Sequence, residues 1–455
     1  MSVSLEVALI SGKRATVEAG LAETVETVAQ RAQLRLGVGK DHLVDAAGSL
    51  DPLASIQRAG LQDGSSLTLH VRPVQVQASR HSFAAILGDS SVLAWGTPGA
   101  GGGDCSAVQD RLKNVQQIQA SERAFAALLG DGTIVTWGTW HECCDFELNI
   151  TGVIAIASNR AAYAAIRSDG SVETWGFMEC GGSTLLTTGP ELQNVAHIQS
   201  SDLAFAAILA DGTVVTWGQP SEGGDSRMVQ DQLKNVQQIQ GNRSAFAAIR
   251  SDGSVVTWGR ADVGGDSSAV QEQLVNVQQI QAGDFAFAAL LGDGTVVTWG
   301  GAEAGGNSST VRDQLKNVMA IQASERSFAA IRSDGSVVTW GDADVGGDSS
   351  DVQEKLTNVQ QIQATTFAFA ALLGDGTVVT WGTDEAGNLR AFAAILADGS
   401  VVTWGDAEIG GDSSDVQDQL KNVQHIQCTP CSFVAVLRDQ SLVTWGRFIG
   451  PREGP

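Results

Sequence analysis

A Trp-Gly pair recurs along most of this chain and sets the strongest limit on its fold. The pair occurs ten times, and an aromatic residue stands twelve positions before each tryptophan. The tryptophans are Trp95, Trp137, Trp175, Trp217, Trp258, Trp299, Trp340, Trp381, Trp404 and Trp445. From Trp217 to Trp381 consecutive members are 41 residues apart. A fixed period of this length is typical of a small unit that packs on copies of itself, in a stack or around a ring.

One unit, residues 235–259, has the sequence NVQQIQGNRSAFAAIRSDGSVVTWG and reads as a β-hairpin. Phe246–Ile249 and Val255–Trp258 are apolar runs rich in residues that favour strands. They are joined through Asp252 and Gly253, and glycine tolerates the positive φ that tight hairpin turns require. The sequence therefore predicts two antiparallel strands that end in the Trp-Gly pair.

The residues before the hairpin extend the unit. Val236, Ile239 and Gln240 predict a further strand, in which the offset between Val236 and Ile239 indicates a local bulge. A short fourth strand is expected at Val229, Gln230 and Leu233. Three or four strands in about 41 residues cannot bury both faces of a sheet, so each unit needs neighbours. Each tryptophan could bury roughly 150–250 Å² against such a neighbour.

The pattern NV-x-x-I-x-A, FAAI, DGSVVTWG and GGD resembles the repeat of the regulator of chromosome condensation family. The resemblance covers residues 74–446 and implies that each unit is a β-propeller blade. Two features differ from the family repeat: the histidine that opens the hairpin remains only at His81, and Gly-Gly-Asp replaces a Gly-Gln-Leu-Gly loop. Trp381 and Trp404 are 23 rather than 41 residues apart, so about 18 residues are missing there. Nine full-length units and one truncated unit are therefore expected.

Residues 1–73 lack the repeat and predict a separate α+β domain. Strand, strand, helix, strand, short helical turn and strand are expected at Ser4–Leu9, Ala15–Glu18, Glu23–Leu36, Asp41–Ala46, Leu53–Ala59 and Leu67–Val71. The helix is predicted because Val25, Val28 and Ala32 fall on one face. This order, carried by SGKRATVEAG, TVETV, HLVDAAG and GSSLTLHVR, resembles the ubiquitin-like β-grasp. The expected fold is mainly β, a propeller-like array of repeats preceded by a small ubiquitin-like domain.

The ubiquitin-like resemblance implies an apolar patch on the sheet that binds a partner. The matching positions here are Ile10, Val44 and His70, although the third position is usually aliphatic. The partner that such a patch implies is a ubiquitin receptor. Ile10 and Val44 could equally help to close the small core, and the sequence leaves both readings open.

The negative charge of the chain is concentrated in the repeats. The whole chain has a formal charge of −23. Residues 1–73 hold seven Lys/Arg and eight Asp/Glu, which leaves 21 basic and 43 acidic residues, a charge of −22, for residues 74–455. Nucleic-acid binding depends on basic side chains that neutralise phosphates, so no nucleic-acid partner is expected. The acidic surface serves either solubility or attraction of a basic protein.

No catalytic constellation is recognisable in the sequence. It has no Walker-type phosphate loop, no metalloprotease His-Glu motif and no nucleophile elbow. The six histidines are scattered, and Cys428 and Cys431 form a lone Cys-x-x-Cys. A zinc site would need four ligands at suitable spacing. We therefore expect no catalytic residue, no cofactor and no metal, and hence no enzyme.

Two repeated polar features are candidate binding surfaces. Glutamines of the predicted first strands could line a central funnel or form a solvated face, and they include Gln116, Gln117, Gln119, Gln237, Gln238 and Gln240. The Gly-Gly-Asp loops are expected to place one Asp or Asn per unit on one rim of a ring. These residues are Asp104, Asp225, Asp266, Asn307, Asp348 and Asp412. They could attract a basic partner or weakly bound Ca²⁺, or only cap their own turns.

These features predict a non-catalytic interaction scaffold or adaptor that binds proteins and links a client to the ubiquitin–proteasome pathway. The repeats resemble the substrate-binding part of HECT-type ubiquitin ligases, without the HECT domain. The alternative is a guanine-nucleotide exchange factor for a small GTPase, as in the founding member of the repeat family. No signal peptide or long apolar run is recognisable, so a soluble cytoplasmic or nuclear protein with no membrane partner is expected. Residues 447–455 are expected to form a disordered tail.

Overall fold

The computed structural model describes residues 2–9, 13–36, 43–45, 48–69, 73–97, 102–139, 148, 150–182, 192–382, 391–396 and 398–447. Within them the chain is mainly β, as the sequence predicts. A five-stranded sheet with one α-helix comes first, and ten small sheets follow. No helix in these ranges has both the length and the apolar character needed to cross a membrane.

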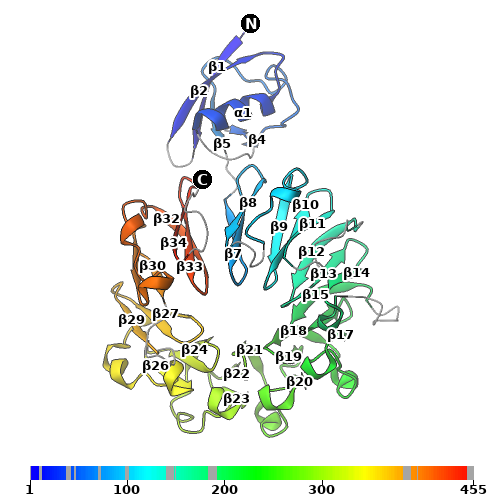
Figure 1. Cartoon of the computed structure of the whole chain (residues 1–455), viewed down its shortest axis with the longest axis vertical. Helices are drawn as coiled ribbons and strands as arrows, with labels where there is room; N and C mark the ends of the chain where they lie inside the picture. The colour runs from blue at the N-terminus through cyan, green and yellow to red at the C-terminus, as the bar shows by residue number, and fades with distance from the viewer. Residues whose placement is uncertain are drawn as a thin grey trace.

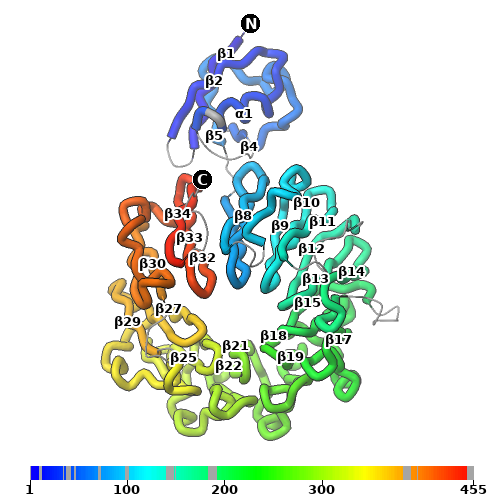
Figure 2. Tube along the Cα trace, in the orientation of Figure 1, coloured from blue at the N-terminus to red at the C-terminus, as the bar shows by residue number. Residues whose placement is uncertain are grey.

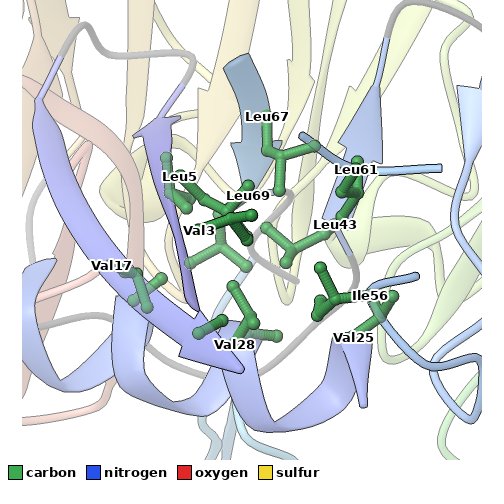
Figure 3. Close-up of a cluster of buried hydrophobic side chains, with 14 of the residues drawn as sticks. Val3, Leu5, Val17, Val25, Val28, Leu43, Ile56, Leu61, Leu67 and Leu69 are labelled. Atoms are coloured by element: carbon green, nitrogen blue, oxygen red, sulfur yellow. The ribbon is translucent and has the colours of Figure 1, made fainter. Parts of the chain in front are cut away.

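The N-terminal domain is a five-stranded sheet packed against one helix (Figure 1). Its elements are β1 (Ser2–Leu9), β2 (Arg14–Gly20), α1 (Val25–Leu36), β3 (Leu43–Asp45), β4 (Gly48–Ser49) and β5 (Ser66–Leu69). The strand order is β2-β1-β5-β3-β4, and β1 pairs with β5 in parallel. Figure 3 shows the core, in which Val25 and Val28 of α1 share one buried cluster with Leu5, Leu43 and Leu69 of the sheet.

Hydrophobic periodicity predicted most of this domain because each element buries one face. Leu5 and Val7 alternate inward on β1, and Val28 and Ala32 repeat inward on α1; all four are buried. Gly48 and Ser49 form the two-residue strand β4, which pairs with β3. The resemblance of the domain to ubiquitin stays a prediction.

Ten sheets follow, one for each Trp-Gly pair, and nine of them have three antiparallel strands in chain order. Their first strands are β6 (Gln75–Ala78), β9 (Val115–Ala120), β12 (Val153–Ser158), β15 (Val195–Ser200), β18 (Val236–Gly241), β21 (Val277–Ala282), β24 (Val318–Ala323), β27 (Val359–Ala364) and β32 (Val423–Thr429). Their second strands are β7 (Ser82–Ile86), β10 (Ala124–Leu129), β13 (Ala162–Arg167), β16 (Ala204–Leu209), β19 (Ala245–Arg250), β22 (Ala286–Leu291), β25 (Ser327–Arg332), β28 (Phe369–Leu373) and β33 (Ser432–Leu437).

The third strands carry the Trp-Gly pairs. They are β8 (Val92–Gly96), β11 (Ile134–Gly138), β14 (Val172–Gly176), β17 (Val214–Gly218), β20 (Val255–Gly259), β23 (Val296–Gly300), β26 (Val337–Gly341), β29 (Val378–Trp381) and β34 (Leu442–Gly446). The ninth sheet, in the truncated unit, has only β30 (Phe392–Ile395) and β31 (Val401–Trp404).

The hairpin register explains why each aromatic residue stands twelve positions before its tryptophan. In the fifth sheet Phe246 of β19 pairs directly with Trp258 of β20, and their ring centroids lie 5.2 Å apart. The turn between them is held by Asp252, whose Oδ1 accepts the backbone N–H of Ser254 at 3.0 Å, while Gly253 adopts φ +75°. The same stacked pair occurs in all ten sheets, with centroids 5.2–5.5 Å apart.

The predicted bulge in the first strand is confirmed. The register of β18 on β19 shifts between Val236 and Gln238, which leaves Gln237 as the extra residue. The shift lets Val236 and Ile239 both enter the buried face although they are three positions apart, while Gln237 and Gln238 are exposed.

The predicted fourth strand is wrong at Val229, Gln230 and Leu233. Instead Gln230–Gln232 form one 3-10 turn, η5. The Gln230 amide accepts a hydrogen bond from Ser226 Oγ at 2.9 Å and donates to the Val214 carbonyl at 2.8 Å. Because these hydrogen bonds satisfy the Gln230 side chain and Leu233 is buried between the fourth and fifth sheets, the segment does not need a strand partner.

The sheets surround a common centre, with the first strands innermost and the third strands outermost (Figures 1 and 2). The last sheet packs on the first: Val434 of β33 shares a buried cluster with Val76 and Phe83. The backbone N–H of Val74 also donates to the side-chain oxygen of Gln440 at 2.6 Å. The array is therefore a closed ring of ten sheets, more than the roughly four to eight blades of typical propellers.

Apolar side chains between neighbouring sheets hold the ring together. Between the fifth and sixth sheets, Ile249 of β19 packs with Leu274, Ile280 and Trp299 of the next unit. The indole Nε1 of Trp299 donates to the carbonyl of Gly264 at 3.0 Å. Each tryptophan that makes this hydrogen bond therefore contacts both the loop that precedes its own sheet and the apolar core.

Candidate functional site

The Gly-Gly-Asp loops leave the ring at the edge where each third strand ends, and they are fixed by polar contacts. In the loop after β20, Thr257 and Ser267 share a hydrogen bond of 3.0 Å between their hydroxyls. The Ser267 hydroxyl also donates to Gln271, whose amide donates to the carbonyl of Val255 at 2.9 Å. This chain of contacts holds Asp266 against the outer strand of its own sheet.

The predicted loop aspartates form the same local turn in the units that carry them, including Asp104, which accepts the backbone N–H of Ser106 at 2.8 Å. Asp225, Asp266, Asp348 and Asp412 each accept the backbone N–H two residues ahead, at 2.8–3.0 Å. Asn307 forms the same turn at 3.0 Å. The backbone hydrogen bond holds the pKa of Asp266 and of Asp412 below the usual range. The turn-capping role is therefore present in the structure, and partner binding by these residues stays a prediction.

A belt of charged side chains lies on the same edge, in the turns between first and second strands, and sequence reasoning missed it. Its members stand three positions before the hairpin aromatic, a regularity that could have revealed them. This charged belt consists of Arg80, Glu122, Arg160, Asp202, Arg243, Asp284 and Glu325. From Arg80 to Asp284, each backbone N–H donates to the carbonyl of the next member at 2.9–3.4 Å. A continuous run of hydrogen bonds therefore links seven sheets.

The first part of the charged belt is neutralised by ion pairs. Glu122 lies 2.8 Å from Arg80 and 2.6 Å from Arg160. Burial raises the pKa of Glu122, but the hydrogen bonds from Arg160 and Arg80 outweigh it and hold that pKa below its ordinary value. Glu122 therefore stays charged and bridges the sheets on either side of its own.

The second part of the charged belt is rich in carboxylates. Arg243 approaches Asp202 at 3.8 Å and lies over the Phe285 ring, 5.6 Å from its centroid. Burial raises the pKa of Asp284 to about 6; the charges of Glu325 and Asp202 add to this effect, and Arg243 opposes it. Asp284 is thus a carboxyl group whose ionisation is unfavourable in the folded ring.

Replacing Asp284 with asparagine should stabilise the protein above pH 7. The folded-state pKa of about 6 exceeds the ordinary 3.8, so this group stabilises the wild type below about pH 4 and loses that contribution as pH rises through 6. The shift corresponds to at most about 3 kcal/mol, and we expect about 1–2 kcal/mol at pH 8 for a partly solvated group. Urea unfolding of both proteins at pH 4.5 and pH 8 measures the difference.

The control is Asp313→Asn, which removes a fully exposed carboxylate with the same change in charge. Asp313 also pairs with Lys316 at 3.4 Å, an exposed contact that contributes little to stability, so Asp313→Asn should not stabilise the protein at pH 8. Equal effects of the two substitutions at pH 8 would show that Asp284 is not penalised by its surroundings.

The structure describes only one residue of the predicted apolar patch. Val44 lies in β3, half-buried, and pairs with Ser49 and Thr68. Its neighbour Leu43 is in the core, so strand alternation places Val44 on the sheet face turned away from α1. Ile10 and His70 lie outside the described residues.

The predicted glutamine lining follows the innermost strand of each sheet. On β18 the bulge leaves Gln237 and Gln238 exposed, and Gln240 is half-buried. On β9 the Gln116 amide donates to Asn114 Oδ1 at 3.1 Å, so part of its hydrogen-bonding capacity is used locally. These positions suit a solvated inner surface, and ligand binding there stays a prediction.

The cysteines do not gather into one site among the described residues. Cys105 and Cys180 are buried, and burial raises the pKa of both thiols, which disfavours the reactive thiolate. Cys428 is exposed and Cys431 half-buried, while Cys143 and Cys144 lie outside the described residues. In the described ranges, no three or more His, Cys, Asp or Glu side chains are grouped to hold a metal ion.

No protein-family model and no curated protein matches this chain. Among solved structures, the computationally designed Ika8 protein is similar at 16% identity and TM-score 0.34, over 69% of this chain and 97% of that one. Prp20p from Saccharomyces cerevisiae is similar at 17% identity and TM-score 0.34, over 50% of this chain and 72% of that one. The CRINKLY WD40 ectodomain of the Arabidopsis thaliana receptor kinase ACR4 follows at 15% identity and TM-score 0.32, over 57% and 90%.

Proposed function

We propose that this protein is a non-catalytic adaptor whose ring binds a basic protein client through its acidic rim. The observation that carries this proposal is the repetition of one ordered acidic turn along a single edge of the ring. Asp225, Asp266, Asp348 and Asp412 occupy equivalent places, each with a backbone hydrogen bond to its carboxylate. Asp225 differs in that Arg227 also pairs with it at 2.6 Å.

Repetition matters because a single exposed ion pair contributes little. A surface pair is worth about 0–1 kcal/mol, whereas several pairs made at once to one extended basic surface add up and speed the encounter. Residues 74–455 carry −22, so the field around the ring favours a basic partner at long range as well. The rigid closed ring keeps the turns at fixed spacing, which limits the entropy lost on binding.

Residues 1–73 supply the second half of the proposed adaptor. The five-stranded order β2-β1-β5-β3-β4 with one helix supports a ubiquitin-like role for this domain. The face opposite α1 carries Val44, and we propose that this face docks on a ubiquitin receptor while the ring holds the client. One small aliphatic patch supports weak docking, so both contacts are needed for a stable assembly.

The two contacts can be separated in one experiment. The variant Asp266→Asn/Asp348→Asn/Asp412→Asn removes three charges but keeps the turns, as Asn307 shows. It should weaken binding of core histones, used as a basic probe, at least tenfold at 150 mM salt and leave binding of a ubiquitin-receptor domain unchanged. Val44→Ala should weaken binding of the ubiquitin-receptor domain and leave histone binding unchanged. Titration calorimetry on the full chain measures both, and equal effects of the two variants on both probes would contradict the adaptor.

Nucleotide exchange on a small GTPase is the alternative activity. The solved structure of Prp20p, which is 17% identical to this chain, is reported with the binding of Prp20p to Gsp1p and histones. Release of labelled GDP from a panel of small GTPases tests this alternative directly. Acceleration by this protein would replace the adaptor proposal.

A further inference from the structure

One junction in the ring differs from the other nine. Nine buried apolar clusters each join two neighbouring sheets, including the cluster that closes the ring. Among the described residues no such cluster joins the eighth sheet (β27–β29) to the ninth (β30–β31). We call this junction the open seam.

The open seam follows from what the truncated unit lacks. In the sixth unit, Leu274, Val277 and Ile280 come from the first strand and the turn before it, and they cover the apolar face of the fifth sheet. The ninth unit passes from Trp381 to Trp404 in 23 residues, so it has no segment of this kind among the described residues.

Two apolar side chains are left uncovered on opposite sides of the open seam. On the eighth sheet, Leu372 is 38% exposed, whereas its equivalent Ile249 is 6% exposed. On the ninth sheet, Val402 is 46% exposed, whereas its equivalent Val256 is 5% exposed. Exposed apolar side chains on both sides of a junction that lacks its buried cluster offer apolar surface to a further segment.

The backbone of β30 adds an unpaired strand edge to this surface. In the nine complete sheets the second strand pairs with a first strand on one side and a third strand on the other. Among the described residues β30 pairs only with β31. The other edge of Phe392–Ile395 can therefore accept an added strand, as in β-strand augmentation.

We propose that the open seam binds an extended peptide segment of a partner protein, which takes the place of the missing first strand. Seven other units of the chain show what fits this position. The required pattern is Leu-x-Asn-Val-x-x-Ile, seen at Leu233, Asn235, Val236 and Ile239, in which the bulge turns both Val and Ile into the seam. This inference concerns a different surface from the acidic rim and does not depend on it.

Charge and position identify the occupant further. The described residues 351–382, 391–396 and 398–411, which border the open seam, contain six acidic side chains and one basic side chain. A segment flanked by lysine or arginine therefore fits better than one flanked by acids. Such a strand would also fill the place between β27 and β32 in the inner ring of first strands. Its contacts would be of the same kind as those that the other first strands make with their neighbours.

The test uses the full chain and a labelled peptide with the sequence of residues 232–241, QLKNVQQIQG, with two lysines added at each end. Fluorescence anisotropy should show micromolar binding. A peptide with Asp at the positions of Val236 and Ile239 should bind at least tenfold more weakly. Hydrogen exchange should show slower exchange of the β30 amides when the first peptide is bound.

Protein variants locate the contact. Val402→Lys and Leu372→Lys should each weaken peptide binding at least tenfold, and their partial exposure makes correct folding expected. Met319→Lys is the matched control, because Met319 is 67% exposed on β24, away from the open seam, and this variant should bind as the wild type does. Thermal melting confirms that all three variants are folded.

Three outcomes would overturn the proposal. The first is the absence of peptide binding to the wild type. The second is equal binding by the Val402→Lys and Met319→Lys variants. The third is a concentration-dependent dimer that the peptide does not dissociate and that Val402→Lys abolishes, which would identify a second copy of the chain as the occupant.

Discussion

Replacing Trp258 with alanine is expected to lower the free energy of unfolding by about 3–5 kcal/mol, as for other large buried aromatic residues. Trp258 is 4% exposed and stacks on Phe246 at 5.2 Å. It packs between the fourth and fifth sheets with Val236 and Ile239, and its indole Nε1 donates to the Gly223 carbonyl at 3.0 Å. The substitution removes the apolar contact, the stacking and the hydrogen bond together. Urea unfolding followed by circular dichroism measures the change.

Trp404 provides the matched control, because the same residue type stands at the open seam. It stacks on Phe392 at 5.5 Å, but it is only half-buried and its indole nitrogen has no hydrogen-bond partner in the described structure. Trp404→Ala should cost about 1–2 kcal/mol, clearly less than Trp258→Ala. Equal losses would show that packing against the preceding sheet contributes little to the effect of Trp258.

Replacing Gly264 with alanine is expected to destabilise the ring by about 2–5 kcal/mol. Gly264 has φ +107°, which an L-residue adopts at a cost of about 1–2 kcal/mol. A Cβ atom there would lie 2.5 Å from Cδ2 of Phe287, inside the core between two sheets, and overpacking adds about 1–3 kcal/mol. Thermal melting and urea unfolding of the variant measure the loss.

Gly376 separates the two causes of that loss. It also has a positive φ, +85°, but nothing lies within 4 Å of the position that a Cβ would occupy. Gly376→Ala should therefore cost about 1–2 kcal/mol, from backbone strain alone. If Gly264→Ala were no worse than Gly376→Ala, Phe287 would have room to move and the loop would not be locked against the neighbouring core.

The sequence was informative wherever structure depends on nearby residues. Phe246 and Trp258 are twelve positions apart because a hairpin with a short Asp-Gly turn brings these positions face to face. The offset of Val236 and Ile239 revealed a bulge because both must reach the same buried face. These are short-range pairings, so local spacing and side-chain type predict them.

The sequence was less informative for the candidate site. The capped turns of the loop aspartates were foreseen, because Asx turns are local. The charged belt was missed although its members keep a constant offset from the hairpin aromatic. Its members interact between units, as Glu122 does with Arg80 and Arg160, which are 42 and 38 residues away along the chain. Such contacts cannot be read from the sequence of one unit.

The sequence by itself determined the repeating hairpin and the spacing of its two aromatic residues. Only the tertiary structure decided that Gln230–Gln232 form a 3-10 turn rather than a fourth strand, since Leu233 is buried between the fourth and fifth sheets. The same holds for closure of the ring through Val76 and Val434. It also holds for the open seam, because the exposure of Val402 depends on how its own two-stranded sheet packs beside the eighth sheet. Packing between units is a long-range property, and a repeat pattern read one unit at a time does not contain it.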